Sequence, residues 1–198
     1  MRGTGLASQP VAQTELPFME MSRAGRRFYA GCSAAITGIA PVQAIPTTAA
    51  QWVLWNADTN RTYFFDMILM ALLSGTPGLS GDAWMTLFSA PAQTGLASGI
   101  TIQSASAGGL TSKASIKSGV TITAPAAPTW FPLGGSIESI TAAAFSAGYS
   151  EIMGDNDVKG AIAVPPGWGL GLAVRAPTGT TPLYGPFLRW IEVEVDAE

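Results

Sequence analysis

Residues 52–73, WVLWNADTNRTYFFDMILMALL, contain a long apolar pattern broken by one polar cluster. The first part is rich in aromatic and branched side chains, which suit a half-buried pleated surface. The cluster NADTN consists of turn formers, and residues 63–70 are then apolar on both alternating faces except at Asp66. We therefore predict two long β-strands joined by a polar turn. A buried helix is the alternative for the second segment, since periodicity alone does not separate the two.

Shorter apolar stretches recur along the chain between Gly and Pro residues, which mark turns. Alternation and β-branched content predict further strands at residues 28–39, 83–88, 99–102, 116–123, 161–164, 170–174 and 186–195. Residues 136–145 are the one helix candidate, with Ser136 as its cap. Eight or nine short strands with at most one short helix indicate an all-β chain. We predict an antiparallel β-sandwich of jelly-roll type.

The first 27 residues show no sustained period and are rich in small and turn-forming residues. We predict an extended N-terminal arm over residues 1–27, followed by a single domain over 28–198. Arg23, Arg26 and Arg27 form a local basic cluster in this arm. We expect them to contact carboxylates of a neighbouring subunit or to stay solvated. The net charge of −3 provides no basic field, so we expect no nucleic-acid partner.

The composition points to association. The chain is 47% hydrophobic and 12% charged, whereas soluble domains contain about 25% charged residues. No apolar run reaches the roughly 20 residues of a membrane span, and the first residues lack the apolar centre of a signal peptide. We therefore expect part of the surface to be hidden against other subunits. A well-packed monomer rich in Ala and Gly is the alternative.

The strand at residues 63–73 is the expected contact, because one of its two apolar faces would otherwise meet water. Simple alternation gives two possible outer sets, one with Phe64 and Ile68 and one with Phe65 and Leu69. We predict that a homo-oligomer buries one of these sets. Asp66 interrupts the strand, and we expect it to form an ion pair or hydrogen bond at an interface, since a lone buried carboxylate is unfavourable.

Catalytic chemistry has little support in the sequence. The chain has no histidine, which excludes the usual serine triad and the Cys–His pair. No pair of carboxylates has a spacing that indicates a glycosidase, so we expect no enzyme and no cofactor. Asp155 and Asp157 are candidate oxygen ligands for Ca²⁺, but the loop lacks EF-hand spacing and its sequence is also that of an ordinary turn. Cys32, the single cysteine, is interpreted as a small core residue.

Two of the six tryptophans are flanked by Pro or Gly in predicted loops, namely Trp130 and Trp168. The others lie in predicted strands and are interpreted as core or interface residues. Exposed indole rings stack on sugars and other flat ligands, so these two are candidates for an exposed binding surface. They support an alternative function, a carbohydrate- or receptor-binding β-sandwich module.

The last 40 residues resemble a known group. GAIAVPPG at residues 160–167 is followed by LGLAV at 170–174 and LRWIEV at 188–193. This order resembles the final three strands of small jelly-roll virion proteins of bacteriophages. LWN at 54–56 and YFFD at 63–66 are similar to the paired early strands of that group. The resemblance implies a structural role in the virion as capsid shell, decoration protein or spike. It also implies a homotrimer with other virion proteins as partners, and it transfers no functional residues.

Overall fold

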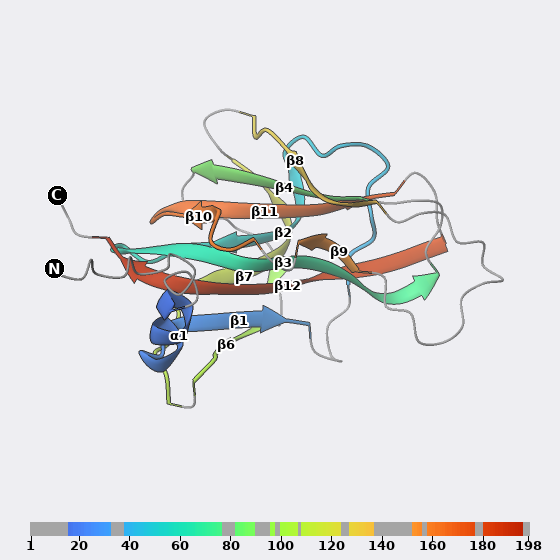
Figure 1. The fold of residues 1–198 in the computed structure, drawn as a ribbon. Helices are drawn as coiled ribbons and strands as arrows, with labels where there is room; N and C mark the ends of the chain where they lie inside the picture. The colour runs from blue at the N-terminus through green and yellow to red at the C-terminus, as the bar shows by residue number, and fades with distance from the viewer. Residues whose placement is uncertain are drawn as a thin grey trace, which may run out of the picture.

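The computed structural model describes residues 16–32, 38–76, 82–89, 96–97, 100–106, 108–123, 127–136, 152–155, 158–176 and 180–195. These residues form an all-β structure of two antiparallel six-stranded sheets with one short helix (Figure 1). Twelve strands are present in the described residues, more than the eight or nine predicted. The additional strands are two to six residues long and lack alternation: β5 (Leu96–Ala97), β8 (Phe131–Ser136) and β9 (Ile152–Asp155).

The first sheet, called sheet A, contains both the first and the last strand of the chain, which pair with each other. Its order is β10 (Ile162–Val164), β3 (Arg61–Thr76), β12 (Thr180–Glu194), β1 (Arg27–Gly31) and β6 (Thr101–Ser104), and β9 also pairs with β3.

The second sheet, called sheet B, contains the remaining strands. Its order is β5, β7 (Ser115–Thr121), β2 (Ala49–Trp55), β11 (Trp168–Arg175), β4 (Asp82–Ser89) and β8.

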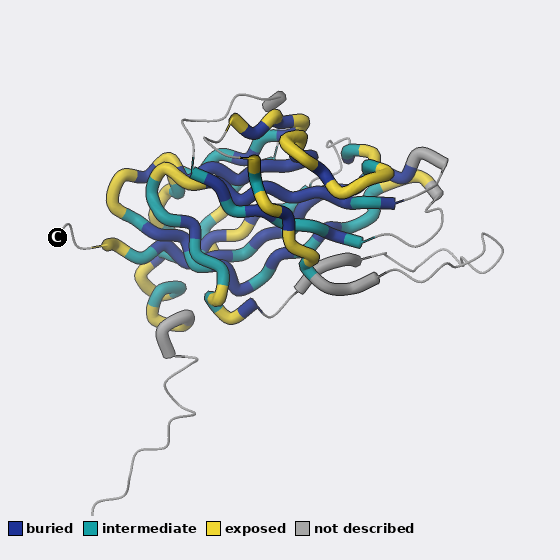
Figure 2. Tube along the Cα trace, turned by 90° about the horizontal axis from the view of Figure 1, so that it is seen from above, coloured by how far each residue is buried: buried dark blue, intermediate teal, exposed yellow. Residues whose placement is uncertain are grey.

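The core lies between the two sheets and is centred on Trp190 of β12, which is fully buried. Its indole ring contacts three aromatic rings of sheet A, with centroid distances of 6.0 Å to Phe28, 6.2 Å to Tyr63 and 5.8 Å to Phe65. Sheet B contributes inward-facing aliphatic side chains, including Leu170 and Leu172. Buried residues accordingly follow the middle of the strands, and exposed residues gather in the connections (Figure 2).

Strands β2 and β3 confirm the two strands predicted in residues 52–73 and exclude the helix alternative. The resemblance implied that these two strands pair with each other. They do not, because β2 belongs to sheet B and β3 to sheet A. The polar turn between them carries the chain across one end of the sandwich. Buried Asn56 holds this turn, because its Nδ2 donates to the carbonyl oxygens of Arg61 at 2.8 Å and Val164 at 2.9 Å.

A β-bulge in β3 changes which residues face the core. The register between β3 and β12 shifts between Arg189 and Trp190, so that residue 66 is the extra residue in β3. Tyr63 and Phe65 face inward before the bulge, and Ile68 and Met70 face inward after it. A bulge adds one residue to a strand with a period of two, so it exchanges the two faces. Neither of the two predicted outer sets is therefore correct.

The prediction of an extended arm over residues 1–27 is wrong for its last part. Residues Leu16–Arg23 form helix α1, and β1 begins at Arg27. The helix ends in a Schellman motif, in which Gly25 has φ +70° and Arg26 N–H donates to the carbonyl oxygen of Met21 at 2.8 Å. Residues 1–15 lie outside the described residues. Of the helix predicted at 136–145, only Ser136 is described, and it ends strand β8.

Candidate functional site

The outer face of sheet B is covered by the chain itself. Val53 and Trp55 of β2, Phe88 of β4 and Ala173 of β11 face outward and form a second apolar cluster there. Ile122, directly after β7, and Trp130, directly before β8, pack on this face and are buried. Gly169 and Gly171 make room for this layer, because a Cβ at either residue would meet Phe88 or Thr86 at less than 3.0 Å.

The outer face of sheet A differs from that of sheet B. Four large apolar side chains on it are only half-buried, and none of them belongs to either apolar cluster of the described residues. These side chains are Phe64, Met67, Leu69 and Phe187, which the strand register places on neighbouring positions of β3 and β12. The sandwich therefore presents one outer face with a buried apolar cluster and one on which four large apolar side chains stay partly exposed.

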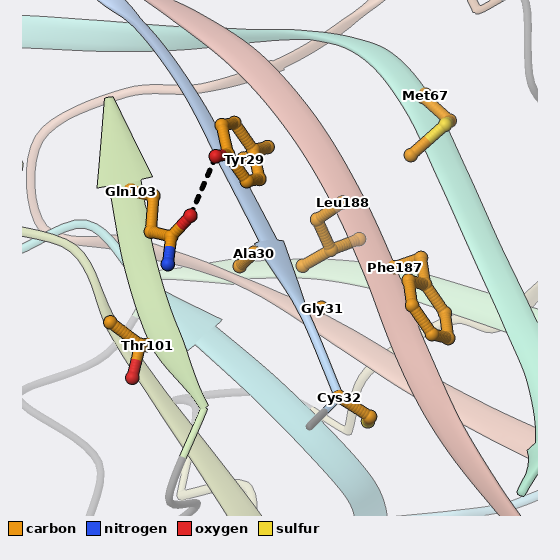
Figure 3. Close-up of a pocket in the computed structure, with 9 residues that line it drawn as sticks. All are labelled: Tyr29, Ala30, Gly31, Cys32, Met67, Thr101, Gln103, Phe187 and Leu188. Atoms are coloured by element: carbon orange, nitrogen blue, oxygen red, sulfur yellow. Dashed lines mark hydrogen bonds between the residues drawn. The ribbon is translucent and has the colours of Figure 1, made fainter. Parts of the chain in front are cut away.

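A hollow of about 370 Å³ lies on this face, over strands β1 and β12 (Figure 3). Met67 and Phe187 line one side, and Tyr29, which is 42% exposed, stands at the other. The Tyr29 hydroxyl donates to Gln103 Oε1 at 2.6 Å, which fixes the ring beside the hollow. Cys32 lies at one end of the hollow and is half-buried, so the prediction that it is a core residue is wrong. Burial raises the pKa of the Cys32 thiol to about 11, which keeps it protonated and unreactive at neutral pH.

Asp66 sits at the bulge on this outer face and is neutralised within its own chain. It accepts from Arg27 Nη2 at 2.6 Å and from Arg189 Nε at 2.9 and 3.0 Å. The expected ion pair of Asp66 is therefore present, but it is formed with two arginines of the same subunit and not at an interface. Two guanidinium groups around one carboxylate leave one positive charge on a face that is otherwise apolar in its centre.

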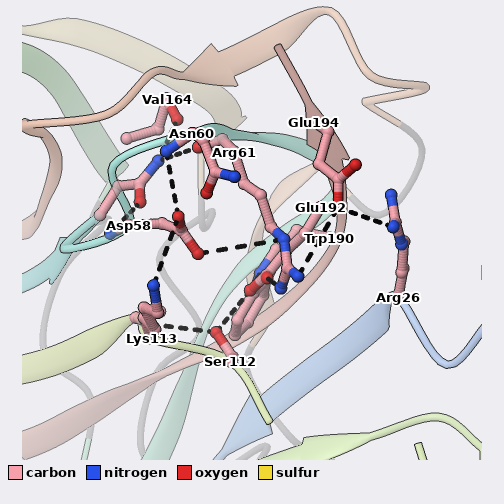
Figure 4. A network of polar contacts seen from close by, with 12 residues as sticks. Arg26, Asp58, Asn60, Arg61, Ser112, Lys113, Val164, Trp190, Glu192 and Glu194 are labelled. Atoms are coloured by element: carbon pink, nitrogen blue, oxygen red, sulfur yellow. Dashed lines mark hydrogen bonds and ion pairs between the residues drawn. The ribbon is translucent and has the colours of Figure 1, made fainter. Parts of the chain in front are cut away.

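A separate polar network closes one end of the sandwich (Figure 4). Arg61 lies between two buried carboxylates, with Nη1 at 3.4 Å from Glu192 Oε2 and Nε at 4.0 Å from Asp58 Oδ2. Ser112 donates to Glu192 Oε1 at 2.5 Å, and Lys113 Nζ lies 3.8 Å from Asp58 Oδ1. The network thus ties the turn after β2 and the loop before β7 to the ends of β3 and β12.

Glu192 is 0% exposed, and no group of a substrate could reach it. Burial raises its pKa above the ordinary value of 4.5, against the opposing effect of hydrogen bonds from Ser112 and Trp190 and of Arg61. Burial, together with the charge of Glu192, also raises the pKa of Tyr63. We interpret this network as structural: it satisfies buried polar groups and anchors two loops.

Substituting Glu192 by glutamine is expected to change the pH dependence of stability. Because the folded pKa of Glu192 lies above its unfolded value, folding takes up a proton. The stabilising contribution is fully present below about pH 4.5 and is lost as the pH rises through the folded pKa. Urea unfolding at pH 4.5 and pH 7 should show that the wild-type protein gains stability relative to E192Q at the lower pH. A difference that is the same at both pH values would contradict this assignment.

The predicted interface residues of β3 divide into two groups. Phe65 and Ile68 are fully buried in the core of the subunit, so they leave no side-chain surface for another subunit. Phe64 and Leu69 lie on the outer face of sheet A and are half-buried. The bulge at residue 66 explains the division, since simple alternation would have put Phe64 with Ile68 and Phe65 with Leu69. An interface role remains a prediction for Phe64 and Leu69.

The basic cluster is also placed within the subunit and not in a free arm. Arg26 Nη2 lies 2.8 Å from Glu194 Oε1, and Arg27 contacts Asp66. Both arginines thus contact carboxylates of their own chain, because β1 lies directly beside β12. Arg23 is exposed in the last turn of α1, where a cation is favourable to the helix dipole.

The two candidate tryptophans have different environments. Trp130 is only 8% exposed, and its Nε1 donates to the carbonyl oxygen of Thr47 at 2.9 Å, so it is part of the outer cluster of sheet B. The prediction that it is exposed is wrong. Trp168 is 38% exposed at the first residue of β11, after a turn in which Gly167 has φ +73°. Trp168 remains available for a ligand.

The metal candidates are not brought together. Asp155 is in strand β9, opposite Ile68, and Asp157 lies outside the described residues. Among the described residues, no three acidic or cysteine side chains gather in a way that could hold a metal ion. The described part of the chain also contains no helix long and apolar enough to cross a membrane.

Sequence reasoning missed two features of these sites. The charge of Glu192 suggests an outward-facing side chain, but Glu192 has the same parity in its strand as Trp190 and Leu188, which face the core. That parity was the available signal. Tyr29 and Phe187 were not singled out, and nothing in their local sequence shows that β1 and β12 would bring them to one hollow.

No family model matches the chain, and no curated protein or solved structure is significantly similar to it.

Proposed function

We propose that this chain is a non-enzymatic structural subunit of a virus particle that acts by self-assembly. One observation carries the proposal: the outer face of sheet A presents half-buried apolar side chains that belong to neither apolar cluster of the described residues, while the outer face of sheet B is covered by its own chain. A charged fraction of 12% agrees with a surface that is hidden in an assembly. The resemblance of residues 160–193 to jelly-roll virion proteins of bacteriophages supports the class.

Within this proposal the sandwich is of jelly-roll type and the subunits form a homotrimer. Two antiparallel sheets with chain crossings between them are compatible with a jelly roll. Cyclic symmetry lets every subunit reuse one patch. The contact would be formed by the outer face of sheet A around Phe64, Leu69 and Phe187. The subunit would act in the capsid shell, as a decoration protein or in a spike, together with other virion proteins.

The double variant Phe64→Asp with Leu69→Asp tests this proposal. Each apolar side chain contributes roughly 1.5–3 kcal/mol at full burial. Losing about half of that contribution at each of the two sites weakens each contact by roughly 1.5–3 kcal/mol, which raises the dissociation constant by roughly 10- to 150-fold. Size-exclusion chromatography with light scattering should show an oligomer for the wild-type chain and a monomer for the variant, with a similar melting temperature of the subunit.

Thr121→Asp serves as the control, because Thr121 is exposed on sheet B and should leave the oligomer unchanged. A wild-type chain that is monomeric at micromolar concentration would contradict the proposal.

A carbohydrate- or receptor-binding module is the second candidate, and the exposed indole of Trp168 favours it. The burial of Trp130 removes the second aromatic residue from such a site. Binding on a glycan array that is lost in Trp168→Ala, by a chain that remains monomeric, would favour this function over assembly.

A further inference from the structure

The edges of the two sheets differ in their protection against pairing with another chain. Sheet B ends in β5, which has two residues, and in β8, which contains Pro132. On one side, sheet A ends in β10, which has three residues, and in β9, which contains Gly154 and Asp155. Short strands, Pro, Gly and charged residues all disfavour edge-to-edge pairing. These edges are therefore poor templates for another strand.

The remaining edge strand, β6, has four residues and is longer than β5 and β10. Its sequence, Thr101-Ile102-Gln103-Ser104, has no charge, no Pro and no Gly. Thr101 and Gln103 are exposed on the outer face of sheet A, where they line one side of the hollow (Figure 3). Ile102 packs against the core and holds the strand in place. The edge is thus uncharged and supported from within.

The direction of its backbone groups follows from one hydrogen bond. Ala105 N–H donates to the carbonyl oxygen of Arg27 at 2.7 Å. In a strand the backbone N–H and C=O of one residue point to the same side, and those of the next residue point to the other side. The backbone groups of Gln103 and Thr101 therefore point toward β1, as those of Ala105 do. Ile102 and Ser104 then point away from β1. No other strand among those described pairs with β6.

We propose that β6 pairs antiparallel with β6 of a second copy of this chain, about a two-fold axis. The inference goes beyond the proposed function and relies on it only for the premise that copies of the chain associate. Joining two sheets edge to edge requires an open edge on each copy, and β6 is the longest of the described edge strands that contain no charge, Pro or Gly. Two identical edges can satisfy each other only in an isologous, antiparallel contact. Sheet A then continues from one subunit into the next.

The outward-pointing groups determine the register of this contact. In one register Ile102 of each copy pairs with Ser104 of the partner subunit. This register uses all the backbone N–H and C=O groups that point outward from the two β6 strands. Gln103 then lies opposite Gln103 of the partner subunit, on the axis and in a non-hydrogen-bonded pair. Such pairs have Cα atoms about 4.5 Å apart, which lies within the range that a disulfide bridges. Because a two-fold contact cannot close a trimer, it links subunits of neighbouring trimers.

Cysteine cross-linking tests the proposal. The variant Gln103→Cys is prepared in a Cys32→Ala background and oxidised, with Thr101→Cys as the matched control on the same strand and face. Residue 101 would lie opposite position 105 of the other copy, about 13 Å from its own counterpart at 3.3 Å per residue. We expect most Gln103→Cys chains to run as disulfide-linked dimers on non-reducing gels, and Thr101→Cys chains to remain largely uncross-linked.

The outcomes separate this inference from the proposed function. Both cysteine variants are also made with Phe64→Asp and Leu69→Asp, and selective cross-linking at position 103 should persist there because the edge contact is distinct from the trimer contact. A wild-type oligomer without cross-linking at 103, or with equal cross-linking at 101, overturns the β6 contact and leaves the proposed function standing. A monomeric wild-type chain that still cross-links selectively at 103 supports the β6 contact and overturns the proposed trimer.

Discussion

Ile68→Asp is expected to unfold the subunit, whereas the same substitution at the next residue, Leu69→Asp, is expected to leave it folded. Ile68 is fully buried in the core, and an unpaired carboxylate there is unfavourable by several kcal/mol. That is a large part of the 5–15 kcal/mol that is typical of the total stability of a domain. Leu69 lies on the outer face of sheet A, where a carboxylate can remain hydrated.

For the pair Phe64 and Phe65, which precedes the bulge at residue 66, the second residue is the buried one and the first lies on the outer face. Phe65→Asp is expected to unfold the subunit, and Phe64→Asp to leave it folded. Circular dichroism and thermal melting of the four single variants check this pattern. If Phe64→Asp and Ile68→Asp behaved alike, the strand would alternate without a bulge and the assignment of its faces would be wrong.

Trp190→Ala is expected to lower the free energy of unfolding by about 3–5 kcal/mol, in the range of large-to-small substitutions at buried aromatic residues. The indole ring of Trp190 contacts Phe28 of β1 and Tyr63 and Phe65 of β3, so truncation leaves a cavity between these three rings. Urea unfolding followed by circular dichroism measures the change.

Trp168→Ala is the matched control, because the same side chain is removed from the rim of the sandwich, where it is 38% exposed. We expect a loss of about 1 kcal/mol or less, since exposed substitutions usually have small effects. Equal losses in the two variants would show that Trp190 is not the centre of the core.

The two outer faces of the sandwich differ in how far their apolar side chains are buried. Ile122 and Trp130 cover sheet B from outside, so that Val53, Trp55 and Phe88 are buried without a partner subunit. The half-buried apolar side chains on the outer face of sheet A belong to no such cluster of the described residues, and they lie around the neutralised Asp66. Under the proposed function, this asymmetry would direct association to the face of sheet A.

The sequence by itself determined the class of the fold and the position of most strands. Alternating or continuous apolar runs between Gly and Pro located β2, β3, β4, β7, β10, β11 and β12, because the period of two and the turn residues act locally. It also indicated that Asp66 needs an ion pair or a hydrogen bond, since an isolated buried carboxylate is unfavourable wherever it lies.

The tertiary structure alone decided which face of each strand is buried and which residues meet. The bulge at residue 66 depends on the register between β3 and β12, strands that are far apart in the sequence, so no local pattern in β3 could place Phe65 and Ile68 on the same side. The burial of Trp130 depends on the distant carbonyl oxygen of Thr47. Glu192 faces inward because β12 presents Trp190 to the core, and a carboxylate is tolerated there only where Arg61 and Ser112 also converge. Such contacts are formed by packing between sheets, which the order of residues along a strand does not specify.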